Sequence, residues 1–187
     1  MPLVFLDIEA SSLAPASYPI EIGWVLEDGT EESHLIRPEA GWTDWDPQAE
    51  VVHGISRAQL AAEGKPAGLV AARVVAALAG HQAVTDAPGW DRTWLGELLA
   101  AGVGHLRVPQ IGDVRTAYGI ACRPLIGTGM PAQEVAALAA RLVAEAEEEV
   151  ARSGPLRHRA LADAERLRAT SLAVRERVGA VLAGAGA

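Results

Sequence analysis

The stretch Leu3-Val4-Phe5-Leu6-Asp7-Ile8-Glu9-Ala10 is an apolar run that carries two carboxylates. We predict a β-strand here, and side chains two apart on a strand leave the same face, so Asp7 and Glu9 point together. Two such charges are costly unless one carboxyl keeps its proton or a cation lies between them. We favour a cation, because hard oxygen ligands select Mg²⁺ or Mn²⁺. The alternative is an edge strand with both acids in water, since D-x-E alone is a common pattern.

The composition predicts one domain of ordinary size, spanning residues 1–187. The chain has 187 residues, a mass of 19.5 kDa and a mean hydropathy of +0.15, and this length is enough to bury a core. No apolar stretch approaches the roughly 20 residues of a membrane span, and the N-terminus lacks the pattern of a signal peptide. The single cysteine, Cys122, excludes an internal disulfide framework and a multi-cysteine zinc site. We therefore expect a cytoplasmic protein with no membrane partner.

The net charge restricts how the surface could hold nucleic acid. The chain has 16 basic and 24 acidic side chains, a formal charge of −8 and a pI near 5.1. Sequence-independent binding of long nucleic acid depends on many phosphate contacts, so it is not expected here. A short strand end bound at a metal remains compatible with this charge.

The rest of the chain predicts an α/β fold. Two further strands, Ile20–Leu26 and His34–Ile36, follow close turns and should be antiparallel to the first. A long loop through Pro47 should lead to a helix that begins at the capping box Ser56-Arg57-Ala58-Gln59. Later elements are expected as helix 66–79, strand Gln82–Thr85, helix Trp90–Ala101, strand Leu106–Ile111, helix Pro131–Arg152 and helix Ala160–Leu182. Strand-helix-strand alternation implies parallel crossovers, so we predict a mixed sheet flanked by helices.

Three further residues are candidates for chemistry. Asp91 falls in the first turn of a predicted helix, where the helix dipole alone would favour an acid. His158 and Asp163 are five residues apart, which on an ideal helix is about 140° beyond a full turn. They can converge only if His158 precedes the helix, and Pro155 makes such a boundary plausible. Taken by itself, His158 between two arginines is typical of a surface histidine.

In combination these residues resemble the DnaQ-like DEDDh 3′→5′ exonucleases. The matching motifs are Asp7-x-Glu9, Trp90-Asp91 and His158-x4-Asp163, and the flanking matches are Phe5, Ser11, Glu21-Ile22-Gly23 and His53-Gly54-Ile55. The resemblance runs from about Leu3 to Thr170 and implies an RNase H-like fold. Departures from the family pattern are Ala10, Ser12 and Asp86, which stand where threonine, glycine and asparagine are frequent. Asp86 adds a fifth acid near the expected site, where it could alter metal affinity or substrate preference.

The resemblance also implies a function and roles for individual residues. The expected activity is metal-dependent hydrolysis of single-stranded DNA or RNA from the 3′ end, with release of nucleoside monophosphates. Two Mg²⁺ or Mn²⁺ ions would be held by Asp7, Glu9, Asp91 and Asp163. Glu9 would also lie near the terminal nucleotide, which Ser11, Ser12 and Leu13 would contact. His158 would accept a proton from the attacking water.

Two other classes of function compete with this prediction. One is a catalytically inactive RNase H-like module that binds nucleic acid or protein, and the other is an acidic interaction protein in which the motifs are coincidental. The sequence does not decide whether the substrate is DNA or RNA. It also leaves open whether the protein acts alone, as a homodimer or in a larger nucleic-acid-processing complex.

Overall fold

The fold is built on a five-stranded mixed sheet in the order β3-β2-β1-β4-β5. The computed structural model describes residues 1–104, 108–153 and 158–184. The strands are β1 Leu3–Ala10, β2 Pro19–Leu26, β3 Glu31–Leu35, β4 Gln82–Thr85 and β5 Ile111–Asp113. The first three strands pair antiparallel, whereas β4 runs parallel to both β1 and β5. The strand that carries Asp7 and Glu9 is therefore central, and the edge-strand alternative is wrong.

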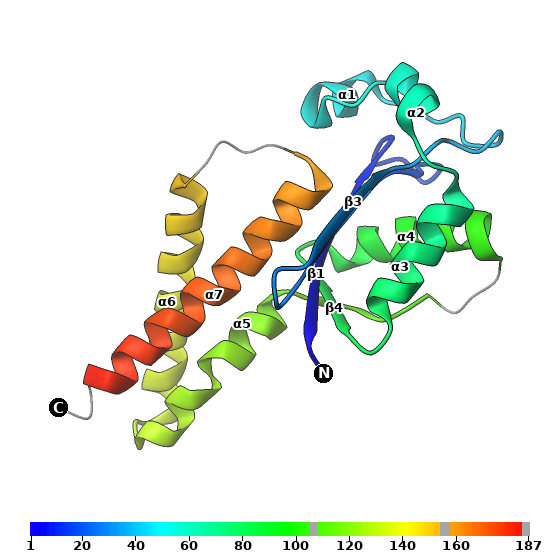
Figure 1. Cartoon of the computed structure of the whole chain (residues 1–187). Helices are drawn as coiled ribbons and strands as arrows, with labels where there is room; N and C mark the ends of the chain where they lie inside the picture. Colours follow the sequence, from blue (N-terminus) through cyan, green and yellow to red (C-terminus); the bar gives the residue numbers. More distant parts are fainter. Residues whose placement is uncertain (105–107, 154–157, 185–187) are drawn as a thin grey trace.

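Helices cover both faces of the sheet (Figure 1). Their bounds are α1 Pro47–His53, α2 Arg57–Glu63, α3 Ala67–Leu78, α4 Pro88–Val103, α5 Arg115–Cys122, the 3₁₀ helix η1 Arg123–Thr128, α6 Ala132–Arg152 and α7 Ala160–Gly184. The helices α3 and α4 lie on one face, and α5, α6 and α7 lie on the other (Figure 1). Among the helices of the described ranges, none is both long enough and apolar enough to cross a lipid bilayer.

The alternation of β1 decides which face receives the two acids. Val4, Leu6 and Ile8 pack in the core beneath α3 and α4, while Leu3 and Phe5 pack against residues of α5 and α7. A slip of one residue would move every apolar side chain of β1 to the wrong face, so packing on both faces holds the register. Asp7 and Glu9 continue the row of Leu3 and Phe5, and they therefore face α7.

The predicted mixed α/β sheet is confirmed, and so are several of its parts. The first strand has the predicted bounds, and β2 and β4 agree within one residue. The Ser56 hydroxyl accepts a hydrogen bond from the Gln59 amide at 3.1 Å, as the capping box requires. These features depend on signals within a few residues of one another, which explains why the sequence reveals them.

Shorter elements differ from the prediction. The segment expected to be a loop contains α1, in which Asp46 accepts a hydrogen bond from the Gln48 amide at 2.8 Å. The third strand begins at Glu31 rather than His34, because it pairs with β2 along Glu21–Val25. The last strand is Ile111–Asp113 rather than Leu106–Ile111, and part of that predicted range lies outside the described residues. Neither α5 nor η1 was predicted, because short elements depend on tertiary packing more than on periodicity.

Candidate active site

Carboxylates from three parts of the fold gather at the carboxyl end of β1. They come from β1 itself, from the segment that leads from β4 into α4, and from the first turn of α7. In each of two groups the oxygen ligand atoms lie within 4.8 Å of one another: Asp7, Asp86 and Asp91 form one group, and Asp7, Glu9 and Asp163 form the other. Asp7 belongs to both groups. The predicted acids are thus brought together, with Asp86 added to them.

Asp91 is placed by the turn from β4 into α4. Its amide donates to the Ala87 carbonyl at 3.1 Å in the first turn of the helix. Its carboxylate Oδ2 accepts a hydrogen bond from Thr85 Oγ1 at 2.5 Å, and the residue is only 1% exposed. A carboxylate that merely complements the helix dipole needs no such burial, so the dipole does not account for Asp91. Sequence reasoning did not identify Thr85, since a threonine at the end of a strand is common.

The start of α7 brings the last two predicted residues into the site. Asp163 lies in its first turn, where its amide donates to the Arg159 carbonyl at 3.0 Å. His158 precedes the helix and is exposed, as the spacing of the two residues requires. Pro155, on which that boundary was argued, lies outside the described residues. A cavity of about 350 Å³ is lined by Asp7, Ile8, Glu9, Asp86, His158, Asp163, Arg166 and Leu167.

Burial and repulsion from nearby acids disfavour the ionised forms of Asp7, Glu9 and Asp91. Burial raises the pKa of Asp7 well above its usual range, and Asp91, Glu9 and Asp86 raise it further. Burial, with repulsion from Glu21, raises the pKa of Glu9 to about 7. The pKa of Asp91 also rises to about 7, chiefly through burial, although the hydrogen bond from Thr85 opposes this. A bound cation would reverse the effect, because opposite charge stabilises the carboxylate.

One basic side chain, Arg166, also borders the cluster. It forms an ion pair with Asp163 one helical turn away, and its positive charge lowers the pKa of Asp7. Sequence reasoning missed Arg166, because its position three residues after Asp163 is equally typical of an ordinary i,i+3 surface pair.

The donor atoms fit hard divalent cations. Every member of the two groups is a carboxylate, and oxygen ligands of this kind prefer small hard ions to soft ones. Asp7 is shared between the groups, which is the arrangement that two neighbouring cations would need.

The three residues expected to contact a terminal nucleotide differ in their surroundings. Ser11 Oγ donates to Asp44 Oδ2 at 3.1 Å and accepts from the Tyr18 amide at 3.1 Å. Ser12 Oγ donates to the same oxygen of Asp44 at 2.6 Å. Both hydroxyls therefore hold the turn after β1. Leu13 is 69% exposed and is open to contact, so the substrate role stays a prediction for all three residues.

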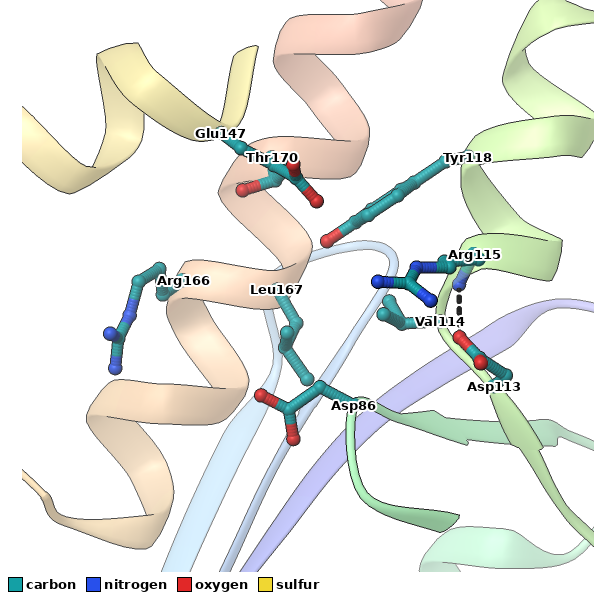
Figure 2. Close-up of a pocket in the computed structure, with 9 residues that line it drawn as sticks. All are labelled: Asp86, Asp113, Val114, Arg115, Tyr118, Glu147, Arg166, Leu167 and Thr170. Atoms are coloured by element: carbon teal, nitrogen blue, oxygen red, sulfur yellow. Dashed lines mark hydrogen bonds between the residues drawn. The ribbon is translucent and has the colours of Figure 1, made fainter. Parts of the chain in front are cut away.

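A second cavity, of about 220 Å³, adjoins the first between β5, α5, α6 and α7. The two cavities share Asp86, Arg166 and Leu167. Figure 2 shows Asp86 at its lower side, Tyr118 and Thr170 at its upper side, and Arg115 between these levels on the right. The hollow at the carboxylates therefore continues beyond Asp86.

Comparison with known proteins shows a shared fold. No protein-family model matches the chain, and neither does any curated protein sequence. Exonuclease I from E. coli, in a zinc-bound complex with single-stranded DNA, is 18% identical with a TM-score of 0.62, over 94% of this chain and 40% of that one. Exonuclease I from Methylocaldum szegediense is 20% identical with a TM-score of 0.64, over 94% and 40%.

A third similar structure is a 3′-exonuclease that recognises the 3′ end of the histone mRNA stem-loop. It is 15% identical with a TM-score of 0.61, over 94% of this chain and 64% of that one. The chain spans less than two thirds of the length of each of these proteins. At such low identities the likeness establishes the fold alone, and it agrees with the RNase H-like fold expected from the motifs.

Proposed function

We propose that the protein is a metal-dependent 3′→5′ exonuclease that acts on single-stranded DNA or RNA ends and releases nucleoside monophosphates. The observation that carries the proposal is the pair of carboxylate groups that share Asp7, together with a cavity in which His158 lies with every member of these groups except Asp91. A fold shared with exonucleases supports the same reading. The exonuclease structures are longer than this chain, and the proposal does not rest on the activity of those complete proteins.

In this proposal Asp7, Glu9, Asp91 and Asp163 hold two Mg²⁺ or Mn²⁺ ions. Asp86 lies in one of the two groups and adds negative charge to it. Ions bound there would offset the charge of a phosphodiester and stabilise the attacking and leaving oxygens of an in-line displacement. The carboxylates would then be ionised at neutral pH, because each would face a cation rather than only its neighbours.

His158 is the proposed general base. Histidine is the side chain that most readily exchanges a proton near neutral pH. The residue lines the cavity from the segment before α7 and is exposed, so a water molecule can reach it. It is not a member of either carboxylate group, which separates the proton acceptor from the metal ligands.

The terminal nucleotide is proposed to lie beside Glu9 and Leu13. Leu13 offers an exposed apolar side chain just after β1, on which a base could pack. The net charge of −8 provides little attraction for the backbone of a long duplex. Capture would therefore depend on the metal-bound end, which favours single-stranded or frayed 3′ ends.

The test is product analysis on 5′-labelled single-stranded DNA and RNA oligomers with Mn²⁺. We expect progressive shortening from the 3′ end and release of mononucleotides, both abolished by a chelator. A matched protein with Asp7→Asn should leave the oligomers intact. If the parent protein binds Mn²⁺ and oligomer but never shortens it, the inactive binding module is the correct alternative.

A further inference from the structure

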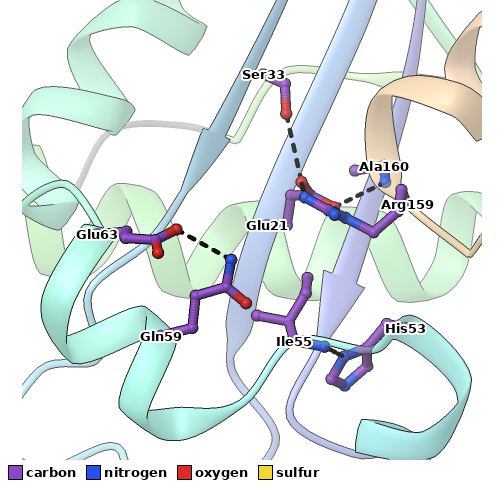
Figure 3. A network of polar contacts seen from close by, with 8 residues as sticks. All are labelled: Glu21, Ser33, His53, Ile55, Gln59, Glu63, Arg159 and Ala160. Carbon is purple, nitrogen blue, oxygen red and sulfur yellow. Dashed lines mark hydrogen bonds and ion pairs between the residues drawn. The ribbon is translucent and has the colours of Figure 1, made fainter.

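A buried carboxylate on β2 holds the segment next to His158. Glu21 Oε1 accepts from Arg159 Nη2 at 2.6 Å, and Oε2 accepts from Arg159 Nε at 2.9 Å and from the Ala160 amide at 3.0 Å. Ser33 Oγ donates to Oε1 at 3.4 Å. Figure 3 shows these groups converging on Glu21 from β3, from the first residue of α7 and from Arg159 just before that helix. The Glu21 side chain is only 3% exposed.

Both oxygens of this carboxylate are thus engaged. A buried carboxylate is costly unless it is paired and hydrogen-bonded, and a bidentate guanidinium is the strongest common partner. Glu21 stands opposite Glu9 in the β1–β2 ladder, yet it belongs to neither carboxylate group. It therefore lies beside the site without being one of its candidate ligands.

The backbone of α7 also touches β2 directly at this point. A Cβ added to Gly23 would lie 2.3 Å from the Leu161 nitrogen and 2.6 Å from the Ala160 carbonyl carbon. Only glycine allows this approach, so the first turn of α7 rests on the strand. Because the Ala160 amide donates to Glu21, the negative carboxylate lies at the N-terminus of α7, where the helix dipole favours it.

We infer that Glu21 and Arg159 are positioning residues that set the place of His158, an inference that rests on the exonuclease function proposed above. Asp163 is held within α7, whose neighbouring residues Ala160 and Ala164 are fully buried. His158 lies outside the helix, and among the described residues no hydrogen bond holds its ring. Among the described residues, the anchor nearest to it along the chain is Arg159, which Glu21 fixes through two hydrogen bonds.

Loss of this anchor should affect catalysis more than metal binding. A displacement of about 1 Å at a reacting group can lower a rate roughly 10²-fold. We therefore expect Glu21→Gln and Arg159→Gln to lower kcat by about 10- to 100-fold while Mn²⁺ affinity and KM stay near those of the parent. Arg159→Lys keeps the charge and one donor, so it should recover part of kcat.

A double-mutant cycle with a matched control tests the inference. The double variant Glu21→Gln/Arg159→Gln should be no slower than the worse single variant, because both changes remove one contact. The control is Arg73→Gln. This substitution also removes an arginine that binds both oxygens of a glutamate, since Arg73 donates to the two oxygens of Glu32 at 3.0 and 2.8 Å. The Arg73–Glu32 pair, however, joins α3 to β3 on the sheet face opposite α7. The control should leave kcat unchanged.

Hydrogen exchange provides a readout that needs no activity. The Ala160 amide should exchange faster in Glu21→Gln than in the parent, while amides in the centre of α7 stay protected. If folded variants keep parental kcat, or lose Mn²⁺ affinity as much as kcat, the positioning role is wrong. If Glu21→Gln fails to fold, the same criteria apply to Arg159→Gln. A parent protein without metal-dependent turnover would reject the proposed function and this inference together, whereas an active parent with unaffected variants rejects the inference alone.

Discussion

Removing the charge of Glu9 should stabilise the metal-free protein above neutral pH. Burial and the facing Glu21 raise the pKa of Glu9 from 4.5 to about 7 in the folded state. A raised pKa means that the folded protein binds the proton more tightly than the unfolded chain does. The stability that this proton contributes is complete below about pH 4.5 and is lost as pH rises through about 7. At pH 8 the ionised carboxylate of Glu9 destabilises the metal-free folded protein, and Glu9→Gln removes this destabilisation.

The size of the effect follows from the two pKa values. The gap between 4.5 and about 7 corresponds to at most about 3 kcal/mol, since one pKa unit is about 1.4 kcal/mol. Glu9 is partly exposed, and solvent screening reduces the cost to about 1–3 kcal/mol. A protein of this size gains about 2–4 °C in Tm per kcal/mol. We therefore expect the Tm of Glu9→Gln to exceed that of the parent by about 2–12 °C at pH 8 in chelator.

Thermal unfolding at pH 4.5 and pH 8, with and without Mn²⁺, measures this prediction. At pH 4.5 the gain in Tm should nearly disappear, because the parent carboxyl is then protonated. At pH 8, saturating Mn²⁺ should make the Tm of the parent higher than that of Glu9→Gln. A ligand at 100 times its Kd adds about 2.7 kcal/mol to the stability of the protein that binds it. Glu148→Gln, an exposed change on α6, is the control and should not depend on pH in this way. A lower Tm for Glu9→Gln at pH 8 in chelator, or an equal gain at both pH values, would refute the reasoning.

The remaining predictions concern turnover. Asp7→Ala should abolish activity while the fold persists, because Asp7 belongs to both carboxylate groups; near-normal activity would place the metal site elsewhere. His158→Ala should lower kcat by roughly 10² to 10⁴ with Mn²⁺ binding retained, the usual scale for loss of a general base, whereas Asp163→Ala should weaken Mn²⁺ binding itself. Calorimetry and kcat on both variants separate these roles, and a His158→Ala protein with full activity would contradict the base assignment. Single-stranded 3′ ends should be degraded faster than blunt duplex, given the charge of −8; equal rates would reject that expectation.

The sequence by itself determined the central strand and the direction of its acids. The alternation in Leu3–Ala10 depends on residues two apart, and this local period survives in any fold that buries the strand. Ser56 as a helix cap and the long helices were predictable for the same reason, because their signals lie within a few residues of one another. Helix α1 does carry a local cap, Asp46, which the sequence reasoning missed, whereas strand β5 is too short for a periodic signal and its stability comes from packing.

Only the tertiary structure decided what the acids do together. Asp91 could have been a solvent-exposed helix cap, and it was the packing of α4 on the sheet that left it 1% exposed beside Asp7. The bonds of Arg159 to Glu21 and the ion pair of Arg166 with Asp163 beside the cluster depend on which face of the sheet α7 covers. That choice is made by contacts between residues far apart in the chain, and no local pattern encodes such contacts. The electrostatics of the site, with several carboxylates whose pKa values are raised by one another and by burial, exist only once those contacts form.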